Sequence, residues 1–78
     1  MSDYKPIHSQ RHAELEVAIL HGLRLRTAWL TDAGQTRVEP LTPLNLNTCE
    51  QAEYLLALDC QGYHVQIRLD RIRAFHPL

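Results

Sequence analysis

The side chains of this chain that are best suited to binding a metal are its five histidines. His8 and His12 are four positions apart, so they would meet on one helix face only if a helix began before Ser9. The others are scattered along the chain at His21, His64 and His76. Because a zinc site needs more than two protein ligands, this spacing predicts no metal site. We expect the histidines to be surface or boundary residues.

Motifs that carry enzyme chemistry are absent from the sequence. It contains no glycine-rich phosphate loop, no Cys-x-x-Cys pair, no His-Glu-x-x-His and no nucleophile elbow. Cys49 and Cys60 could pair in principle, but a chain without an export signal usually keeps its thiols reduced, so we expect reduced, partly buried thiols. The sequence therefore predicts a protein that is not an enzyme and has no catalytic residues, no cofactor and no small-molecule substrate.

Arginines form two groups toward the two ends of the chain, and no lysine or arginine occurs between Arg37 and Arg68. The groups are Arg24 and Arg26 in the first part, and Arg68, Arg71 and Arg73 in the last. If the first and last strands are neighbours, these arginines form a basic patch. Such a patch binds the phosphates of RNA, and nearby aromatic side chains stack on the bases.

Two interpretations of the arginines remain open. In the first, they hold RNA, with Tyr63 or Phe75 as a stacking partner. In the second, they pair with carboxylates on a solvated sheet face, namely Glu53, Asp59 and Asp70. We favour the second interpretation, because the aromatic residues are few and their spacing places most of them in the core.

The composition sets the class of protein. The chain has 78 residues, of which 45% are hydrophobic and 22% charged, which is typical of one folded domain spanning 1–78. Eight Lys and Arg against nine Asp and Glu give a net charge of −1, so no overall field attracts nucleic acid. The start MSDYKPIH lacks the apolar core of a signal peptide, and no apolar segment has the length of a membrane span. We therefore expect a cytoplasmic protein with no membrane partner.

A helix is predicted at about 10–21. Ser9 is a suitable N-cap, and Gly22 suits the left-handed position that follows a helix. One face carries the apolar stripe Leu15, Ala18 and Ile19, which we expect to pack on the rest of the domain.

The other faces of this helix carry charge and further apolar residues. Glu14 and Glu16 flank the apolar stripe on opposite sides. Val17 and Leu20 widen the apolar surface beyond what a solvated helix needs.

Alternation of apolar and polar residues predicts a strand at 23–31. The apolar side of this strand comprises Leu23, Leu25, Thr27 and Trp29. A short loop with Gly34 leads into a returning strand at 36–40. We expect Pro40 and Pro43 to end that strand, because proline cannot donate to a strand ladder, and PLTPLNLNTCEQ to be a longer connection.

Three more strands are predicted in the last part of the chain, at 53–60, 63–69 and 71–75, with a tight turn at Gln61 and Gly62. We expect Trp29 and Tyr63 to lie in the core. We also expect the stretch YKPI, just before the helix, to be anchored to the sheet. The order of one helix and about five strands suggests a strongly bent antiparallel sheet or small barrel, capped by the helix.

A series of short stretches covers nearly the whole chain in order. It comprises YKPI at 4–7, LE at 15–16 followed by Ala18, His21 and Leu23 at the helix end, EYL at 53–55, and IRLD at 67–70 followed by Ile72 and Phe75. This series resembles the Rof family, small bacterial inhibitors of the transcription termination factor Rho. The resemblance implies an Sm-like fold, in which an N-terminal helix lies on a strongly bent five-stranded sheet.

The resemblance also implies a function. Members of the family bind the N-terminal RNA-binding domain of Rho, obstruct its primary RNA site and reduce Rho-dependent termination. A basic groove that binds RNA phosphates also accepts a surface with suitably spaced carboxylates. The helix residues that we expect to contact Rho are Gln10, Arg11, Ala13, Glu14, Glu16, Val17 and Leu20.

The chain departs from the family pattern at the start of this helix. Better-known members have a run of acids there, whereas this chain has Gln10, Arg11, His12 and Ala13, although a first turn favours acids. Two explanations remain open: binding through the remaining acids to a Rho whose surface has changed to suit, or a different role. The alternatives are an Sm-like RNA-binding protein that uses the arginine patch, and a small module that binds another protein.

Overall fold

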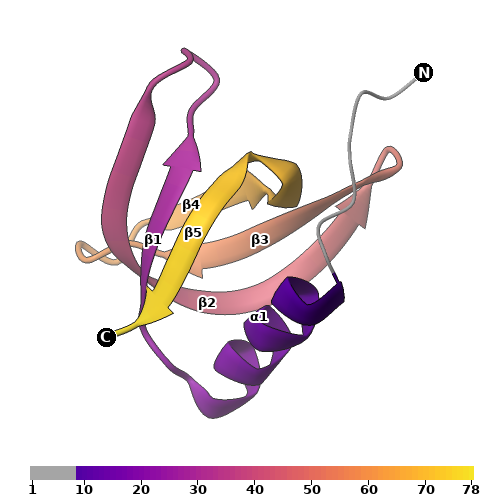
Figure 1. Cartoon of the computed structure of the whole chain (residues 1–78). Helices are drawn as coiled ribbons and strands as arrows, with labels where there is room; N and C mark the ends of the chain where they lie inside the picture. Colours follow the sequence, from indigo (N-terminus) through magenta and orange to yellow (C-terminus); the bar gives the residue numbers. More distant parts are fainter. Residues whose placement is uncertain (1–8) are drawn as a thin grey trace.

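The structure, a computed structural model, describes residues 9–78 (Figure 1). Within them, one helix precedes five strands that form an antiparallel sheet in the order β4-β3-β2-β1-β5. The elements are α1 (Ser9–His21), β1 (Leu25–Leu30), β2 (Thr36–Cys49), β3 (Ala52–Leu58), β4 (His64–Arg68), the 3₁₀ turn η1 (Leu69–Arg71) and β5 (Ile72–Pro77). The expected class is confirmed: a mainly β fold with one helix and a bent, unclosed five-stranded sheet, consistent with a small open barrel. The expectation for residues 4–7 lies outside the described residues.

The helix α1 packs on the sheet through the stripe that its sequence predicts. Leu15 and Ala18 are 0% and 2% exposed. At its C-terminal end, the N–H of Leu23 donates to the carbonyl of Ala18 (2.9 Å), and the N–H of Gly22 donates to Ile19 (3.3 Å). These two bonds form a Schellman motif, which requires the positive φ of Gly22 (64°). None of the helical segments within 9–78 has the length and apolar character needed to cross a membrane.

The strand β2 contradicts the prediction that Pro40 and Pro43 end a strand. It continues through both prolines to Cys49 and curves along the whole sheet (Figure 1). Its first part, up to Leu41, pairs with β1, and its second part pairs with β3. Each proline therefore lies where β2 is paired on one side, and the register shifts between Pro43 and Asn45. Prolines are tolerated on an unpaired side and at such irregularities, so they bend this strand without ending it.

The remaining strands differ from the predicted ones at their ends. β1 begins at Leu25 because Leu23 belongs to the helix cap, and Leu23 is accordingly exposed. The apolar alternation that predicted a strand at 63–69 extends beyond β4 into η1. Leu69 is fully buried there, although it is no longer part of the strand. β5 extends to Pro77, and its register with β1 shifts at Trp29.

The core lies between α1 and the concave side of the sheet. Its largest fully buried side chains are Leu15, Leu41, Leu55, Leu69 and Thr27. Trp29 is buried among them, as predicted.

Tyr63 was expected in the core, and this prediction is wrong: it is 67% exposed. Tyr63 lies in the β3–β4 turn, where its backbone N–H and that of Gln61 both donate to the Asp59 carboxylate, each at 2.9 Å. The alternating pattern therefore extends one residue beyond the strand itself. The two cysteines are free thiols. They are more exposed than predicted, because Cys49 ends β2 and Cys60 lies in the same β3–β4 turn.

A two-residue turn joins β2 to β3 and has an unfavourable sequence. Cys49 and Ala52 are paired across it, and the residues between them, Glu50 and Gln51, have φ values of 51° and 67°. Hairpin turns of this type favour Asn-Gly, because a Cβ is unfavourable at positive φ.

We predict that Gln51→Gly raises the free energy of unfolding by up to about 1 kcal/mol, because glycine adopts this φ without steric cost. Gln61→Gly is the control, since Gln61 lies in a turn but not at positive φ, and we expect it to lower stability slightly. Urea unfolding of the three proteins measures both effects. A destabilised Gln51→Gly variant would contradict the explanation.

Candidate functional site

An apolar ridge runs along the side of α1 that faces solvent. We define the outer ridge as Ala13, Val17 and Leu20, which are spaced four and three residues apart. Since Leu15 and Ala18 face the core, helix geometry turns these positions outward. Val17 is 50% exposed and Leu20 80%. Exposed apolar side chains in a row, unlike scattered ones, are typical of a surface that binds a partner.

The outer ridge is bordered by hollows on both sides. On one side, a groove of about 720 Å³ lies between α1 and β2, and the partly buried Ile19 and Leu46 are among its lining residues. On the other side, a hollow of about 380 Å³ lies between α1 and the end of β5. That hollow is lined mainly by apolar side chains: Ala18, Leu23, Leu25, Phe75 and Pro77. The ridge and its hollows give α1 a shaped apolar surface.

Acidic side chains lie on both sides of the outer ridge. Glu16 lines the groove toward β2, and Glu14 lines the hollow toward β5. Gln10 lies at the β5 side as well. Seven residues of this helix were expected to contact a partner. All of them except Arg11 form the outer ridge or border it.

Arg11 lies away from the outer ridge, on the β5 side of α1. Its Nη2 donates to the carbonyl oxygen of Arg73 at 3.2 Å, and its guanidinium lies 5.1 Å from the ring centre of Phe75. These contacts explain why a cation is tolerated in the first turn: a backbone carbonyl and an aromatic face stabilise its charge. The contact crosses 62 positions of the sequence, so no local pattern predicted it.

His12 lies between two carboxylates and joins α1 to the sheet through one of them, Glu53 of β3. Its Nδ1 lies 2.7 Å from Glu16 Oε1, and its Nε2 lies 3.0 Å from Glu53 Oε2. Carboxylates only accept, so both ring nitrogens donate when the imidazole is protonated. The hydrogen bond to Glu53 raises the pKa of His12 above its ordinary value of 6.5, and the bond to Glu16 adds to this, while partial burial opposes it. Sequence analysis missed this cluster, although His12 and Glu16 have the spacing of a helix pair.

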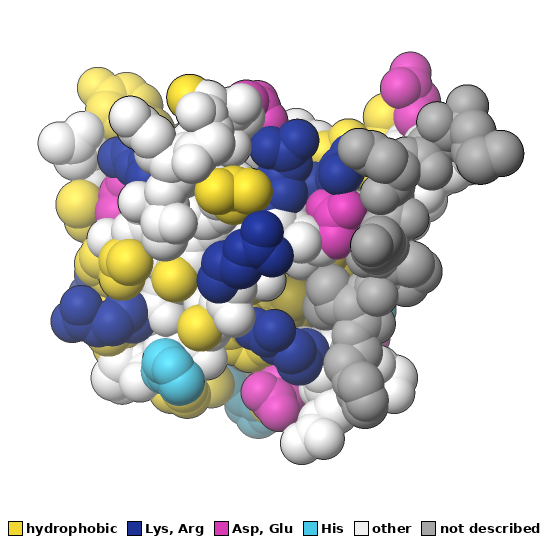
Figure 2. All heavy atoms as spheres, turned by 45° about the horizontal axis from the view of Figure 1, so that its top comes forward, with side chains coloured by type: hydrophobic (Ala, Val, Ile, Leu, Met, Phe, Trp, Pro, Cys, Tyr) yellow, Lys and Arg dark blue, Asp and Glu magenta, His cyan; other side chains and the backbone are white. Residues whose placement is uncertain are grey.

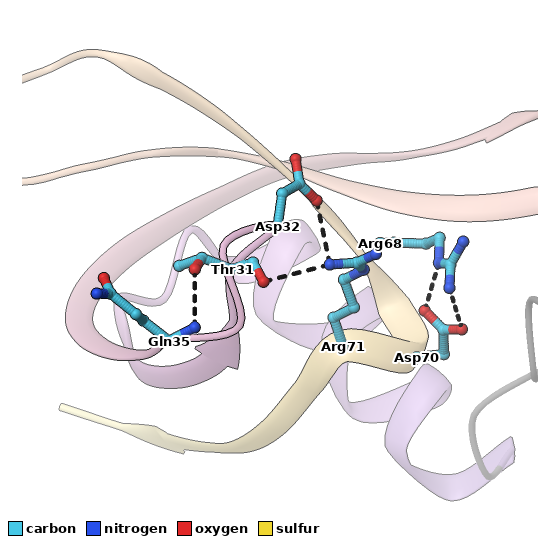
Figure 3. A network of polar contacts seen from close by, with 6 residues as sticks. All are labelled: Thr31, Asp32, Gln35, Arg68, Asp70 and Arg71. Carbon is cyan, nitrogen blue, oxygen red and sulfur yellow. Dashed lines mark hydrogen bonds and ion pairs between the residues drawn. The ribbon is translucent and has the colours of Figure 1, made fainter.

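The arginines of the last strands are largely engaged with carboxylates and backbone (Figure 3). Arg68 reaches both oxygens of Asp70, at 2.7 and 2.9 Å. Arg71 donates to the carbonyl of Thr31 at 3.3 Å and pairs with Asp32 at 3.1 Å. Of the three carboxylates predicted to pair with arginines, Asp70 does so. Glu53 instead binds His12, and Asp59 accepts hydrogen bonds from the backbone of the β3–β4 turn.

The structure separates the predicted arginine patch into two parts. Arg68, Arg71 and Arg73 line one hollow of about 420 Å³, next to the β1–β2 loop. Arg24 and Arg26 lie at the opposite end of β1, where Arg26 is directly across from His76 of β5. Of the two predicted stacking residues, Phe75 is half-buried under Arg11, and Tyr63 is exposed in the β3–β4 turn. No cluster of side chains suited to a metal occurs within 9–78.

Comparison with known proteins identifies the fold. No family model matches the sequence, and no curated protein matches it. A solved structure, proteasome accessory factor B/C (PafBC) of Arthrobacter aurescens, is similar over 97% of this chain, with a TM-score of 0.79 and 22% identity. The similar region covers 13% of the PafBC chain, so this protein corresponds to a small part of that one. At this identity the likeness shows a shared fold.

We predict that His12 makes stability depend on pH. Its folded pKa is raised, so its contribution is fully present below pH 6.5 and is lost as the pH rises through the folded pKa. Urea unfolding between about pH 6 and 8.5 should therefore show a decline in stability above pH 6.5 that is reduced in His12→Gln. An equal decline in both proteins would show that His12 is not responsible.

Proposed function

We propose that this protein binds the transcription termination factor Rho through the outer ridge of α1 and its flanking acids. By occupying the N-terminal RNA-binding domain of Rho, it would block the primary RNA site and reduce Rho-dependent termination. The observation that carries this proposal is the exposed row of Ala13, Val17 and Leu20 between Glu14 and Glu16. The resemblance of the sequence to the Rof family supplies the identity of the partner.

The chemistry of this surface matches that of a basic groove. The centre of a protein interface is apolar and its rim is polar, which is the arrangement of the outer ridge and its acids. Carboxylates at the rim attract a surface that is positive because it binds RNA, and this attraction raises the association rate. Apolar side chains such as Leu20 then supply the burial that holds the complex together.

The absence of acidic residues from the first turn of α1 is consistent with this proposal. Arg11 turns to β5 and leaves the ridge to other side chains. Glu14 and Glu16 lie one turn further along α1, so they present the negative charge nearer to Val17. Glu16 already accepts a hydrogen bond from His12, whereas the described residues show no ion pair for Glu14. We therefore expect Glu14 to contribute more to binding than Glu16.

Reversing the helix acids should weaken binding to Rho. We expect Glu14→Lys to reduce the affinity severalfold and the double change Glu14→Lys with Glu16→Lys to reduce it by more than about tenfold, a loss of about 1.4 kcal/mol. The matched control is Glu50→Lys, an exposed acid at the β2–β3 turn, which should bind as the unchanged protein does. Affinities for intact purified Rho measure the effect, together with RNA binding by Rho as the protein is added.

A second variant, with its own matched control, tests the apolar part of the surface. Leu20→Ser should weaken Rho binding by about tenfold with little change in stability, because Leu20 is mostly solvent-exposed. Val38→Ser is the control, since Val38 is also exposed but lies on β2, on the far side of the sheet from the core. If Glu14→Lys and Leu20→Ser bind Rho as tightly as their controls do, the assignment of α1 is wrong. If the unchanged protein does not bind Rho, the partner is wrong.

A further inference from the structure

We propose that a second surface of this protein, separate from the outer ridge, binds the phosphates of single-stranded nucleic acid. We define the β5 cationic face by four residues: Arg11, Arg26, Arg73 and His76. This function goes beyond the proposed binding of Rho, because it uses other residues and another ligand.

These four residues come from three elements and lie along one edge of the sheet, with Arg73 near the β1–β2 loop and Arg26 toward the other end of β1. Arg26 of β1 and His76 of β5 are direct neighbours across the two strands. Arg73 lies near the start of β5, where the register with β1 is irregular. Arg11 comes from α1, donates to the Arg73 carbonyl and shares a shallow hollow with His76. Figure 2 shows several basic side chains on the face that it displays, with Asp and Glu side chains among them.

The cations of this face are not neutralised by carboxylates. Arg26, Arg73 and Arg11 make no ion pair within the described residues, in contrast to Arg71, which pairs with Asp32, and Arg37, which pairs with Glu39. The carboxylate that shares the hollow of Arg11 and His76 is Glu14, at the α1 side. Although the net charge is only −1, acids lie beside the outer ridge, and arginines that form no ion pair within residues 9–78 lie near β5.

The chemistry of this face suits phosphate. Guanidinium groups bind phosphate oxygens through two parallel hydrogen bonds and remain charged at all relevant pH values. Phe75 of β5 is half-buried with Arg11 above it, and the exposed apolar residues Pro77 and Leu78 lie at the end of the strand. The cations of this face therefore do not surround an apolar centre of the kind found in protein interfaces. The face also lacks an open aromatic platform, so we expect contacts to the backbone with little preference for sequence.

The edge position of β5 favours a flexible, extended ligand. β5 is an outer strand of the sheet, so one of its sides has no neighbouring strand, although residues of α1 lie beside it. A single strand of nucleic acid can follow this edge and place successive phosphates beside Arg11, Arg73 and Arg26. Three or four such contacts give weak binding that depends strongly on salt.

Fluorescence anisotropy with labelled uridylate and thymidylate oligomers tests the proposal. We expect binding at low salt, with a slope of log affinity against log salt of about −2 to −3 for three to four phosphate contacts. Arg26→Glu and Arg73→Glu should each weaken binding by about tenfold or more. Arg37→Glu, which changes the charge equally on another part of the sheet, should weaken it less than about twofold. If one of the reversals does not fold, Arg26→Gln and Arg73→Gln provide the same comparison with a smaller expected loss.

The outcomes separate this proposal from its alternatives. Similar affinity for both oligomers supports recognition of the shared sugar–phosphate backbone, and a preference for one identifies RNA or DNA as the ligand. Equal losses with Arg37→Glu, or no binding at low salt, would overturn the proposal. Binding of polyglutamate with no binding of either oligomer would also overturn it, in favour of an acidic polypeptide. Because Glu14→Lys should weaken Rho binding but leave or strengthen binding of the oligomers, each function can fail without the other.

Discussion

The packing of Leu15 and Ala18 against the sheet is the contact on which the surface of this protein depends. These two side chains are almost completely buried, so they fix the rotation of α1 about its own axis. With 100° between successive residues, that rotation points Val17 and Leu20 to solvent, Arg11 toward β5 and His12 toward β3. The outer ridge, the arginine over Phe75 and the histidine between two carboxylates are therefore three consequences of one packing arrangement. The bent strand β2 makes it possible, because its curvature gives the helix a concave surface to occupy (Figure 1).

A small, nearly neutral chain can still present two surfaces of different chemistry. Along α1, the apolar ridge is flanked by Glu14 and Glu16, which suits a protein with a basic groove. Along β5, arginines that make no ion pair within residues 9–78 suit a polyanion. The two surfaces meet at the hollow shared by Arg11 and Glu14. The two proposed activities use different residues, so single substitutions separate them.

Much of the fold follows from local sequence patterns, and the exceptions have a common cause. The stripe of Leu15 and Ala18, the cap at Gly22 and the alternation around Trp29 each depend on neighbouring residues, so the sequence predicts them. The continuation of β2 through Pro43 depends on which side of the strand is paired, and this is decided by residues far away in the sequence. The contacts of Arg11 and His12 also link distant segments. For this reason the sequence predicted Arg11 to be a partner-binding residue, and it did not predict the hydrogen bond between His12 of α1 and Glu53 of β3. The outward positions of Glu14, Val17 and Leu20 followed from helix periodicity alone.

The central claim is that the outer ridge of α1 is the surface that binds Rho. Hydrogen exchange of the protein alone and in complex with intact Rho tests it most directly, because it locates the bound surface without any substitution. The account predicts added protection in α1 and in the part of β2 around Leu46, which lines the adjoining groove. Protection confined to β4 or β5, or unchanged exchange along α1 in a complex that does form, would contradict it.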